Sequence, residues 1–288
     1  MDYIKSMRLK QWIKNILIFA TMFTSGSFNY DNFFTLLYIF ASFSLVVSST
    51  YIFNDFIDID SDSKHPTKSS RPIAAGKISK KNGITFMFFL FLLGNLTLYF
   101  LDSRLIVFSL LYTVITYSYS KKLKYIKYLD ISVIALLFVL RILIGSLATS
   151  VPTSSPLILF IFFISLGIAA GKKLSIMKNE LITASNVKDF LIISYSEDNL
   201  IFTLKSTLQL SLVTYIIWVI VVKSLILNSL SSVFLAISCI FLFFFIDKFI
   251  ENSILGLTEE IIEQVKDDKS LTYLALLFGV SLSLGLIF

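Results

Sequence analysis

Nine long apolar stretches constrain the fold of this chain more than any other feature. They cover roughly 14–28, 33–53, 83–101, 104–120, 129–149, 156–171, 208–228, 232–250 and 271–288. A helix that crosses a bilayer needs about 20 mostly apolar residues. The hydrophobic fraction of 56% and the 29 phenylalanines also exceed the usual content of a soluble domain. The sequence therefore predicts an all-α integral membrane protein, with residues 1–288 forming a single polytopic domain of nine transmembrane helices.

The distribution of Lys and Arg predicts how these helices are oriented. If the N-terminus is cytoplasmic, all but three of the 25 Lys and Arg residues face the cytoplasm, the exceptions being Arg104, Arg141 and Lys223. Such an excess is typical of cytoplasmic loops. We therefore expect a multi-pass protein of the cell inner (plasma) membrane, with cytoplasmic active-site loops at 54–82 and 172–207. Basic loops beside anionic lipid explain the net charge of +6 without a nucleic-acid partner.

An acidic stretch, residues 54–62, directly follows the second apolar run. If the helix continues, Asp55, Asp58 and Asp62 share one face with Asn54 beside them, whereas Asp60 points elsewhere. Carboxylates this close repel each other unless a cation lies among them. Ligands that are all oxygen suit Mg²⁺, which completes its shell with water and substrate phosphate. A solvated helix end is the simpler interpretation, but the spacing at the membrane edge favours a site for a metal-bound diphosphate.

Basic residues follow the acidic stretch within the same loop. Lys64, Lys68 and Arg71 could hold the side of a diphosphate that faces away from the metal. Pro66 and Pro72 stiffen the loop. The sequence therefore predicts that one loop supplies both carboxylates and phosphate-binding cations.

These motifs resemble the UbiA superfamily of intramembrane prenyltransferases. The pattern Asn54-Asp55-x-x-Asp58-x-x-x-Asp62, followed by His65-Pro-x-Lys-x-x-Arg-Pro-Ile-Ala-Ala-Gly76, is similar to its first signature. Three further stretches are similar to the branch that transfers phosphoribosyl groups: Arg8-Leu9-Lys10-Gln11-Trp12-Ile13-Lys14-Asn15, Leu140-Arg141-Ile142-Leu143-Ile144-Gly145 and Ala170-Gly171-Lys172-Lys173. The resemblance implies nine helices around a central cavity that is capped by cytoplasmic loops.

The resemblance also implies an activity and a set of site residues. The expected reaction transfers 5-phosphoribosyl from phosphoribosyl diphosphate (PRPP) to a polyprenyl phosphate lipid and releases diphosphate. Mg²⁺ is the implied cofactor, and Asp55, Asp58 and Asp62 are the implied metal ligands and catalytic residues. Self-association is left open. The implied substrate-binding residues are Lys10, Lys14, Asn54, Lys64, Lys68, Arg71, Lys122, Asp130, Arg141, Lys172 and Lys173.

The chain departs from the family pattern in its second polar loop. Members that prenylate aromatic rings carry a second Asp-x-x-x-Asp motif there. This chain has instead Lys172, Lys173, Lys178, Glu180 and an isolated Asp189. The phosphoribosyltransferase branch commonly has a glutamate where this chain has Ile176. A basic second loop suits a donor that carries more phosphate than a prenyl diphosphate does.

Two groups of basic residues have two interpretations each. Arg141 lies in mid-membrane, where an unpaired cation is expensive. It is held either by Asp130, three helical turns earlier, another carboxylate or backbone carbonyls, or else it contacts substrate phosphate. Lys10 and Lys14 flank Trp12, and they contact either lipid headgroups or the acceptor phosphate.

Two other functions remain open at this point. A UbiA-type prenyltransferase would use a polyprenyl diphosphate and an aromatic or glycerol acceptor. A transporter or lipid-binding protein would need ionisable residues along a path through the membrane, and Arg141 alone is clearly placed for that role.

Overall fold

The computed structural model describes residues 1–288 except 26–28, 66, 180–185, 224–229, 258–260 and 288. Its described residues form helices and connecting segments, with no β-strand among them. They group into two compact units. The first comprises Met1–Pro152 with the described part of Leu181–Phe190, and the second comprises the described parts of Thr153–Glu180 and Leu191–Phe288. Whether residues 1–288 act as one domain stays a prediction.

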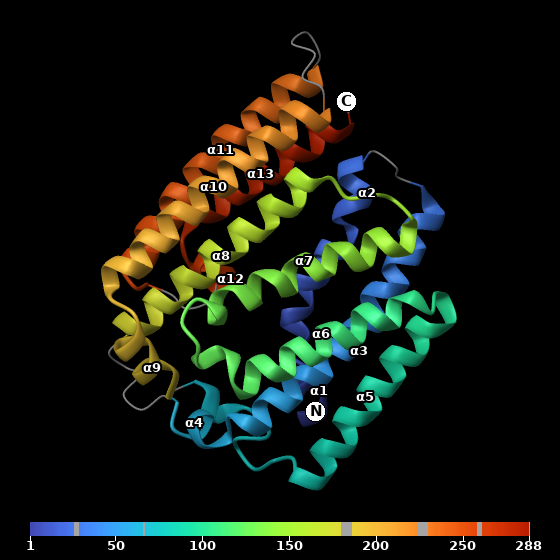
Figure 1. Cartoon of the computed structure of the whole chain (residues 1–288), viewed down its shortest axis with the longest axis vertical. Coiled ribbons are helices and arrows are strands. Elements are labelled where there is room, and N and C mark those ends of the chain that lie inside the picture. Colours follow the sequence, from blue (N-terminus) through green and yellow to red (C-terminus); the bar gives the residue numbers. More distant parts are fainter. Residues whose placement is uncertain (26–28, 66, 180–185, 224–229, 258–260, 288) are drawn as a thin grey trace. The chain divides into compact units, whose positions relative to one another are not determined.

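The first unit is built around two long helices that pack along each other, α3 and α5 (Figure 1). Asn29 begins α3, because its side chain accepts a hydrogen bond from the amide of Asn32 at 2.7 Å. Gly94 lets α5 approach α3, since a Cβ there would lie 2.7 Å from the carbonyl oxygen of Ser42. The elements of this unit are α1 (Asp2–Ser6), η1 (Leu9–Phe19), α2 (Ala20–Ser25), α3 (Tyr30–Ile57), α4 (Ile59–Ser63), η2 (Lys68–Ser70), α5 (Lys80–Leu101), α6 (Arg104–Lys121), η3 (Leu123–Tyr125) and α7 (Leu129–Thr149).

The N-terminal segment is a 3-10 helix, η1, and not the start of a long α-helix. Two polar side chains fasten it to α3: Trp12 Nε1 donates to Ser48 Oγ at 3.0 Å, and Asn15 Nδ2 donates to Ser44 Oγ at 2.8 Å. On α7, any Cβ at Gly145 would clash with the carbonyl oxygen of Ile18. The segment is therefore held by close contacts on both sides.

The second unit consists of α8 (Ser155–Lys178), α10 (Glu197–Lys223), α11 (Leu230–Ile254), α12 (Ile261–Asp267) and α13 (Lys269–Ile287), together with the end of α9 (Asn186–Ser194). Helix α8 packs on α10, and α11 packs on α13. Tyr215 and Trp218 are fully buried, and Tyr215 shares a hydrogen bond of 2.7 Å with Ser238 Oγ. Because α8 continues to Lys178, Lys172 and Lys173 lie on a helix and not in the predicted loop at 172–207.

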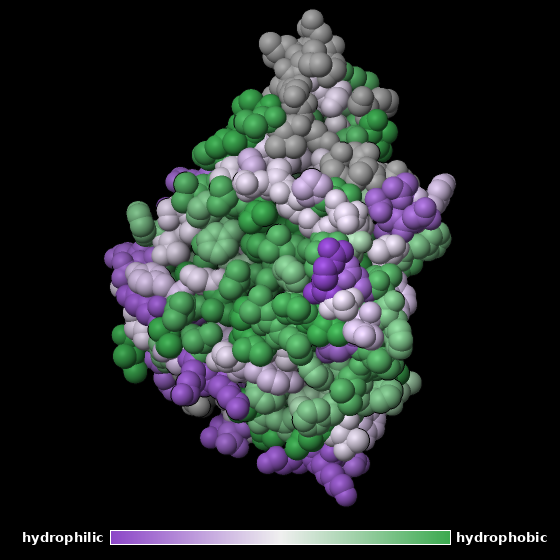
Figure 2. All heavy atoms as spheres, turned by 45° about the vertical axis from the view of Figure 1, so that its right-hand side comes forward, coloured by the Kyte–Doolittle hydropathy of each residue, from purple (hydrophilic) through white to green (hydrophobic). Residues whose placement is uncertain are grey.

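Seven helices within the described ranges are long and apolar enough to span a membrane. Exposed apolar side chains such as Phe88, Phe89 and Leu92 cover the outside of α5, and Figure 2 shows apolar residues gathered over the visible face. The predicted spans at 14–28 and 104–120 are not among the seven, so a count of nine is not confirmed. The seven are Tyr30–Ile57, Lys80–Leu101, Leu129–Thr149, Ser155–Lys178, Glu197–Val221, Leu230–Ile254 and Lys269–Ile287.

Candidate active site

The acidic stretch crosses the end of α3 and the short helix α4. Helix α3 ends at Ile57, and Asp58 leaves helical geometry with φ −99° and ψ 10°. Backbone bonds nevertheless continue through the break, since the amide of Asp62 donates to the carbonyl of Asp58 at 2.7 Å. Asp55 and Asp62 therefore stay on one hydrogen-bonded stretch of backbone. Asp60, in contrast to both, is exposed.

Arg71 joins Asp55 and Asp62. Its Nη1 lies 2.5 Å from Asp62 Oδ2 and 3.3 Å from Asp55 Oδ1. Both aspartates are buried, with 2% and 4% of their surface exposed. The short helix η2 ends at Ser70 and directs Arg71 toward them. Charge-assisted bonds of this kind are what buried carboxylates require.

Arg8 is a second guanidinium on Asp55. Its Nη2 donates to Asp55 Oδ1, and its guanidinium carbon lies 5.1 Å from the centre of the Tyr51 ring. Arg8 occupies the left-handed region, with φ 53° and ψ 52°, between α1 and η1. Non-glycine residues rarely adopt this conformation, and it persists where the surroundings hold it.

Asp58 has different partners. Lys124 Nζ lies 2.5 Å from Asp58 Oδ1, and Asn54 Nδ2 donates to Asp58 Oδ2 at 2.9 Å. Lys124 belongs to η3 and is only 4% exposed. Lys122, the residue predicted from the sequence, is exposed. The cluster thus combines three aspartates with Arg8, Arg71 and Lys124, so that three negative charges face three positive ones.

The donor set is of the right kind for a hard divalent cation, because it consists of carboxylate oxygens. Its arrangement is that of ion pairs, since a side-chain cation contacts each of the three carboxylates. Within the described ranges, no three His, Cys, Asp or Glu residues are grouped so that they could hold a metal ion. The chemistry of these oxygen donors fits Mg²⁺, but each aspartate is paired with a side-chain cation, so the role of Asp55, Asp58 and Asp62 as metal ligands stays a prediction.

The other predicted residues of the first unit vary in exposure. Lys10, Lys64 and Lys122 are exposed, and Lys14 and Lys68 are partly buried. Asp130 is completely buried at the start of α7, where its Oδ1 accepts from the amide of Ile131 at 3.0 Å. Pro66 lies outside the described residues.

The hydrogen-bond partners of Arg141 are neutral groups and do not include Asp130. Its Nε donates to Asn15 Oδ1 at 2.8 Å, its Nη1 to the carbonyl of Leu137 at 2.5 Å and its Nη2 to the Tyr112 hydroxyl at 2.9 Å. The aromatic rings of Tyr112 and Phe138 lie about 5 Å from the guanidinium. These contacts favour the structural interpretation of Arg141, in which it links η1, α6 and α7.

The remaining predicted basic residues belong to the second unit. Lys173 is buried on α8, and Lys172 is partly buried. Lys178 lies 2.6 Å from Glu197 Oε1 and donates to the carbonyl of Ile254 at 2.7 Å, which ties the end of α8 to α10 and α11. Glu180 lies outside the described residues.

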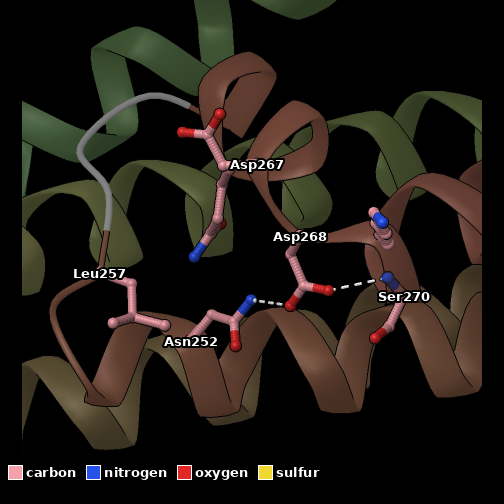
Figure 3. A pocket seen from close by; sticks show the side chains of 7 residues that line it. Asn252, Leu257, Asp267, Asp268 and Ser270 are labelled. Carbon is pink, nitrogen blue, oxygen red and sulfur yellow. Dashed lines mark hydrogen bonds between the residues drawn. The ribbon is translucent and has the colours of Figure 1, made fainter.

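A cavity of about 450 Å³ also lies in the second unit, and no predicted site residue lines it (Figure 3). Asp268 caps the start of α13 there: it accepts from Asn252 Nδ2 at 2.7 Å and from the amide of Ser270 at 2.8 Å. The bond from Asn252 is the main reason why the pKa of Asp268 is lowered. The residues that line the cavity are Asn252, Leu257, Gln264, Asp267, Asp268, Lys269 and Ser270.

Comparison with known proteins assigns the chain to a family. Residues 16–250 match the UbiA prenyltransferase family model. The chain belongs to the UbiA prenyltransferase family. The sequence resemblance is thereby confirmed, and the protein falls in a class of membrane-embedded transferases.

Two relatives and one solved structure illustrate the range of this UbiA family. Decaprenyl-phosphate phosphoribosyltransferase of Mycolicibacterium smegmatis is 30% identical over 220 residues, which are 75% of this chain and 69% of that protein. The protein y4nM of Sinorhizobium fredii is 38% identical over 58% of this chain but only 33% of its own length. A UbiA homologue from Archaeoglobus fulgidus bound to GPP and Mg²⁺ has the same fold, with a TM-score of 0.65, 16% identity and coverage of 99% of this chain and 98% of its own.

Proposed function

We propose that this UbiA-family protein transfers 5-phosphoribosyl from PRPP to a polyprenyl phosphate. The products are 5-phosphoribosyl-1-phosphoryl-polyprenol and diphosphate. The observation that carries the proposal is the ion-pair cluster: Arg8, Arg71 and Lys124 all lie on the acidic motif, so three cations are at hand for a phosphate-rich donor. The similarity to decaprenyl-phosphate phosphoribosyltransferases supports the same donor.

The proposed reaction exchanges one bond at the anomeric carbon of the ribose. A bond from this carbon to an oxygen of the acceptor phosphate forms as the bond to diphosphate breaks. The acceptor oxygen is already anionic at neutral pH, so no general base is required. This agrees with the local role of His65, whose Nδ1 accepts from the amide of Thr67 at 3.3 Å.

Charge neutralisation on the leaving diphosphate is then the main demand on the protein. When bound to Asp55, Asp58 and Asp62, Mg²⁺ would supply part of that neutralisation. Arg71 and Lys124 would bind phosphate oxygens of the donor. We assign Lys10 and Lys14 on η1 to the acceptor phosphate, because Trp12 fixes this segment against α3. Lys64, Lys68, Lys172 and Lys173 remain proposed phosphate contacts.

Thermal protection of the purified protein tests the donor. Mg²⁺ with PRPP should raise the melting temperature more than Mg²⁺ with geranyl diphosphate, because PRPP presents more phosphate to the cluster. Asp58→Asn should abolish the PRPP effect, and Asp60→Asn, on an exposed side chain, should keep it. Protection by geranyl diphosphate alone would contradict the proposal.

The second candidate is prenyl transfer from a polyprenyl diphosphate to an aromatic or glycerol acceptor. The GPP bound to the Archaeoglobus homologue favours it. The lack of an Asp-x-x-x-Asp motif after residue 171 argues against it. We do not retain the transporter interpretation, because the family is one of transferases.

A further inference from the structure

Arg8 holds Asp55 from outside the acidic motif, across 47 residues of sequence. The two side chains differ in access to solvent, since 20% of the Arg8 side chain is exposed but only 2% of that of Asp55. The guanidinium is therefore open to a ligand on one side, while its carboxylate partner is enclosed.

Arg8 and Arg71 depend on Asp55 to different degrees. Arg71 also contacts Asp62, at the shorter distance of 2.5 Å, and would keep that partner if Asp55 turned to another cation. Among the described residues, Asp55 is the only carboxylate that contacts Arg8. Without it, Arg8 would retain the face of the Tyr51 ring but no anion. A metal ion that displaces Arg8 from Asp55 would therefore leave Arg8 in need of a new anionic partner.

We propose that Arg8 is a phosphate-binding residue that Asp55 holds until a divalent cation binds the acidic cluster. This inference rests on the proposed function for one point, that the ligand of the acidic cluster is a metal-bound diphosphate. A guanidinium suits this exchange because its planar set of N–H donors binds carboxylate and phosphate in the same bidentate way. A partly buried cation without a partner is unfavourable. Metal binding at Asp55 and phosphate binding at Arg8 should therefore favour each other, and the coupling must be reciprocal.

The position of Arg8 in the chain extends the effect to the N-terminal segment. Arg8 lies immediately before η1, in a left-handed conformation that its contacts stabilise. Its exchange of partners would alter the start of η1, the segment that carries Lys10 and Lys14. Binding of the donor phosphate at Arg8 would thereby change the conformation of η1, the segment that we assign to binding the acceptor phosphate.

The test measures this coupling with Mg²⁺ and inorganic diphosphate on the full chain in detergent. The apparent diphosphate affinity, read from the melting temperature, should rise about tenfold with Mg²⁺ in the wild type. In Arg8→Gln the gain should fall to about threefold or less. The matched control is Arg104→Gln, which removes an exposed arginine paired with Asp102 and should behave as wild type. Mg²⁺ also binds diphosphate in solution, and comparison with this control removes that contribution from the measured gain, because it is the same for every variant.

Two further measurements test the inference if the Arg8→Gln variant does not fold. Arg8→Lys keeps the charge without the planar donor set and should give an intermediate gain. In the wild type, hydrogen exchange of residues 2–19 should change only when Mg²⁺ and diphosphate are added together. A folded Arg8→Gln with the wild-type gain, or an exchange pattern indifferent to both ligands, would overturn the inference. The test contains no ribose or prenyl group, so it is separate from a failure of the proposed function.

Discussion

Lys124 Nζ lies 2.5 Å from Asp58 Oδ1, although 66 residues separate the two in sequence. Breaking a buried pair of this kind costs about 3 kcal/mol. We therefore expect Lys124→Gln to lower the melting temperature and the transferase activity strongly. The exposed Lys122→Gln, two residues earlier, is the matched control and should change both only slightly. Equal effects of the two variants would contradict the assignment of Lys124.

Gly145 allows η1 to lie against α7, because a Cβ there would clash with the backbone carbonyl of Ile18. Gly145→Ala should therefore destabilise the protein by roughly 2 kcal/mol, as overpacked sites do. Gly279 on α13 is the control, since a Cβ at this position meets no atom within 4 Å. Gly279→Ala should be neutral or slightly stabilising. Thermal unfolding of both variants in detergent measures the difference, and a stable Gly145→Ala would argue against close packing of η1.

The acidic motif and the apolar helices could be predicted from the sequence because both are local patterns. The position of Arg71 beside the acidic motif was also predictable, since Arg71 follows Asp62 in the same loop. Arg8 and Lys124 were missed as site residues because their partners lie far away in sequence. The segment between α6 and α7 contains several lysines. The structure buries Lys124 on η3 and leaves Lys122 exposed, and no sequence signal that we can identify distinguishes the two.

Long-range polar contacts also explain why the sequence does not predict the 3-10 segment at the N-terminus or all the partners of Arg141. An apolar run at 14–28 indicates a helix but cannot reveal that Trp12 and Asn15 bind serines on α3 and favour a 3-10 segment. Arg141 donates to the carbonyl of Leu137 on its own helix, which agrees with one of the partners expected from the sequence, but also to Asn15, 126 residues away, which no local pattern indicates. Periodicity describes one helix at a time, so such partners lie beyond it.

Asp268 should make stability depend on pH in the acidic range. Its pKa in the folded state is lowered, first by the bond from Asn252, so its ionised form stabilises the fold. This contribution is complete above the ordinary aspartate pKa of about 3.9 and is lost as the pH falls through the lower, folded value. Asn252→Ala should therefore lose less stability than wild type between about pH 6 and about pH 3. Parallel melting curves of the two proteins would contradict this.

The orientation in the membrane can be tested with single cysteines in a Cys239→Ala background. A cysteine at Ser63, which is exposed at the end of α4, should react with an impermeant maleimide from the cytoplasmic side. A cysteine at Ser154, immediately before α8, should react from the outside. The expectation rests on the asymmetry of Lys and Arg. Labelling of both positions from the same side would contradict it.

The identity of the lipid product tests the account most directly. Membranes that contain the protein are given Mg²⁺, a polyprenyl phosphate, PRPP labelled in the ribose, a polyprenyl diphosphate and an aromatic acceptor together. Mass spectrometry of the lipid extract should then show a labelled polyprenol carrying phosphoribosyl phosphate, in amounts that fall sharply in Asp58→Asn. A prenylated ring without this labelled lipid would contradict the account, and would mean that Arg71 and Lys124 serve a prenyl diphosphate.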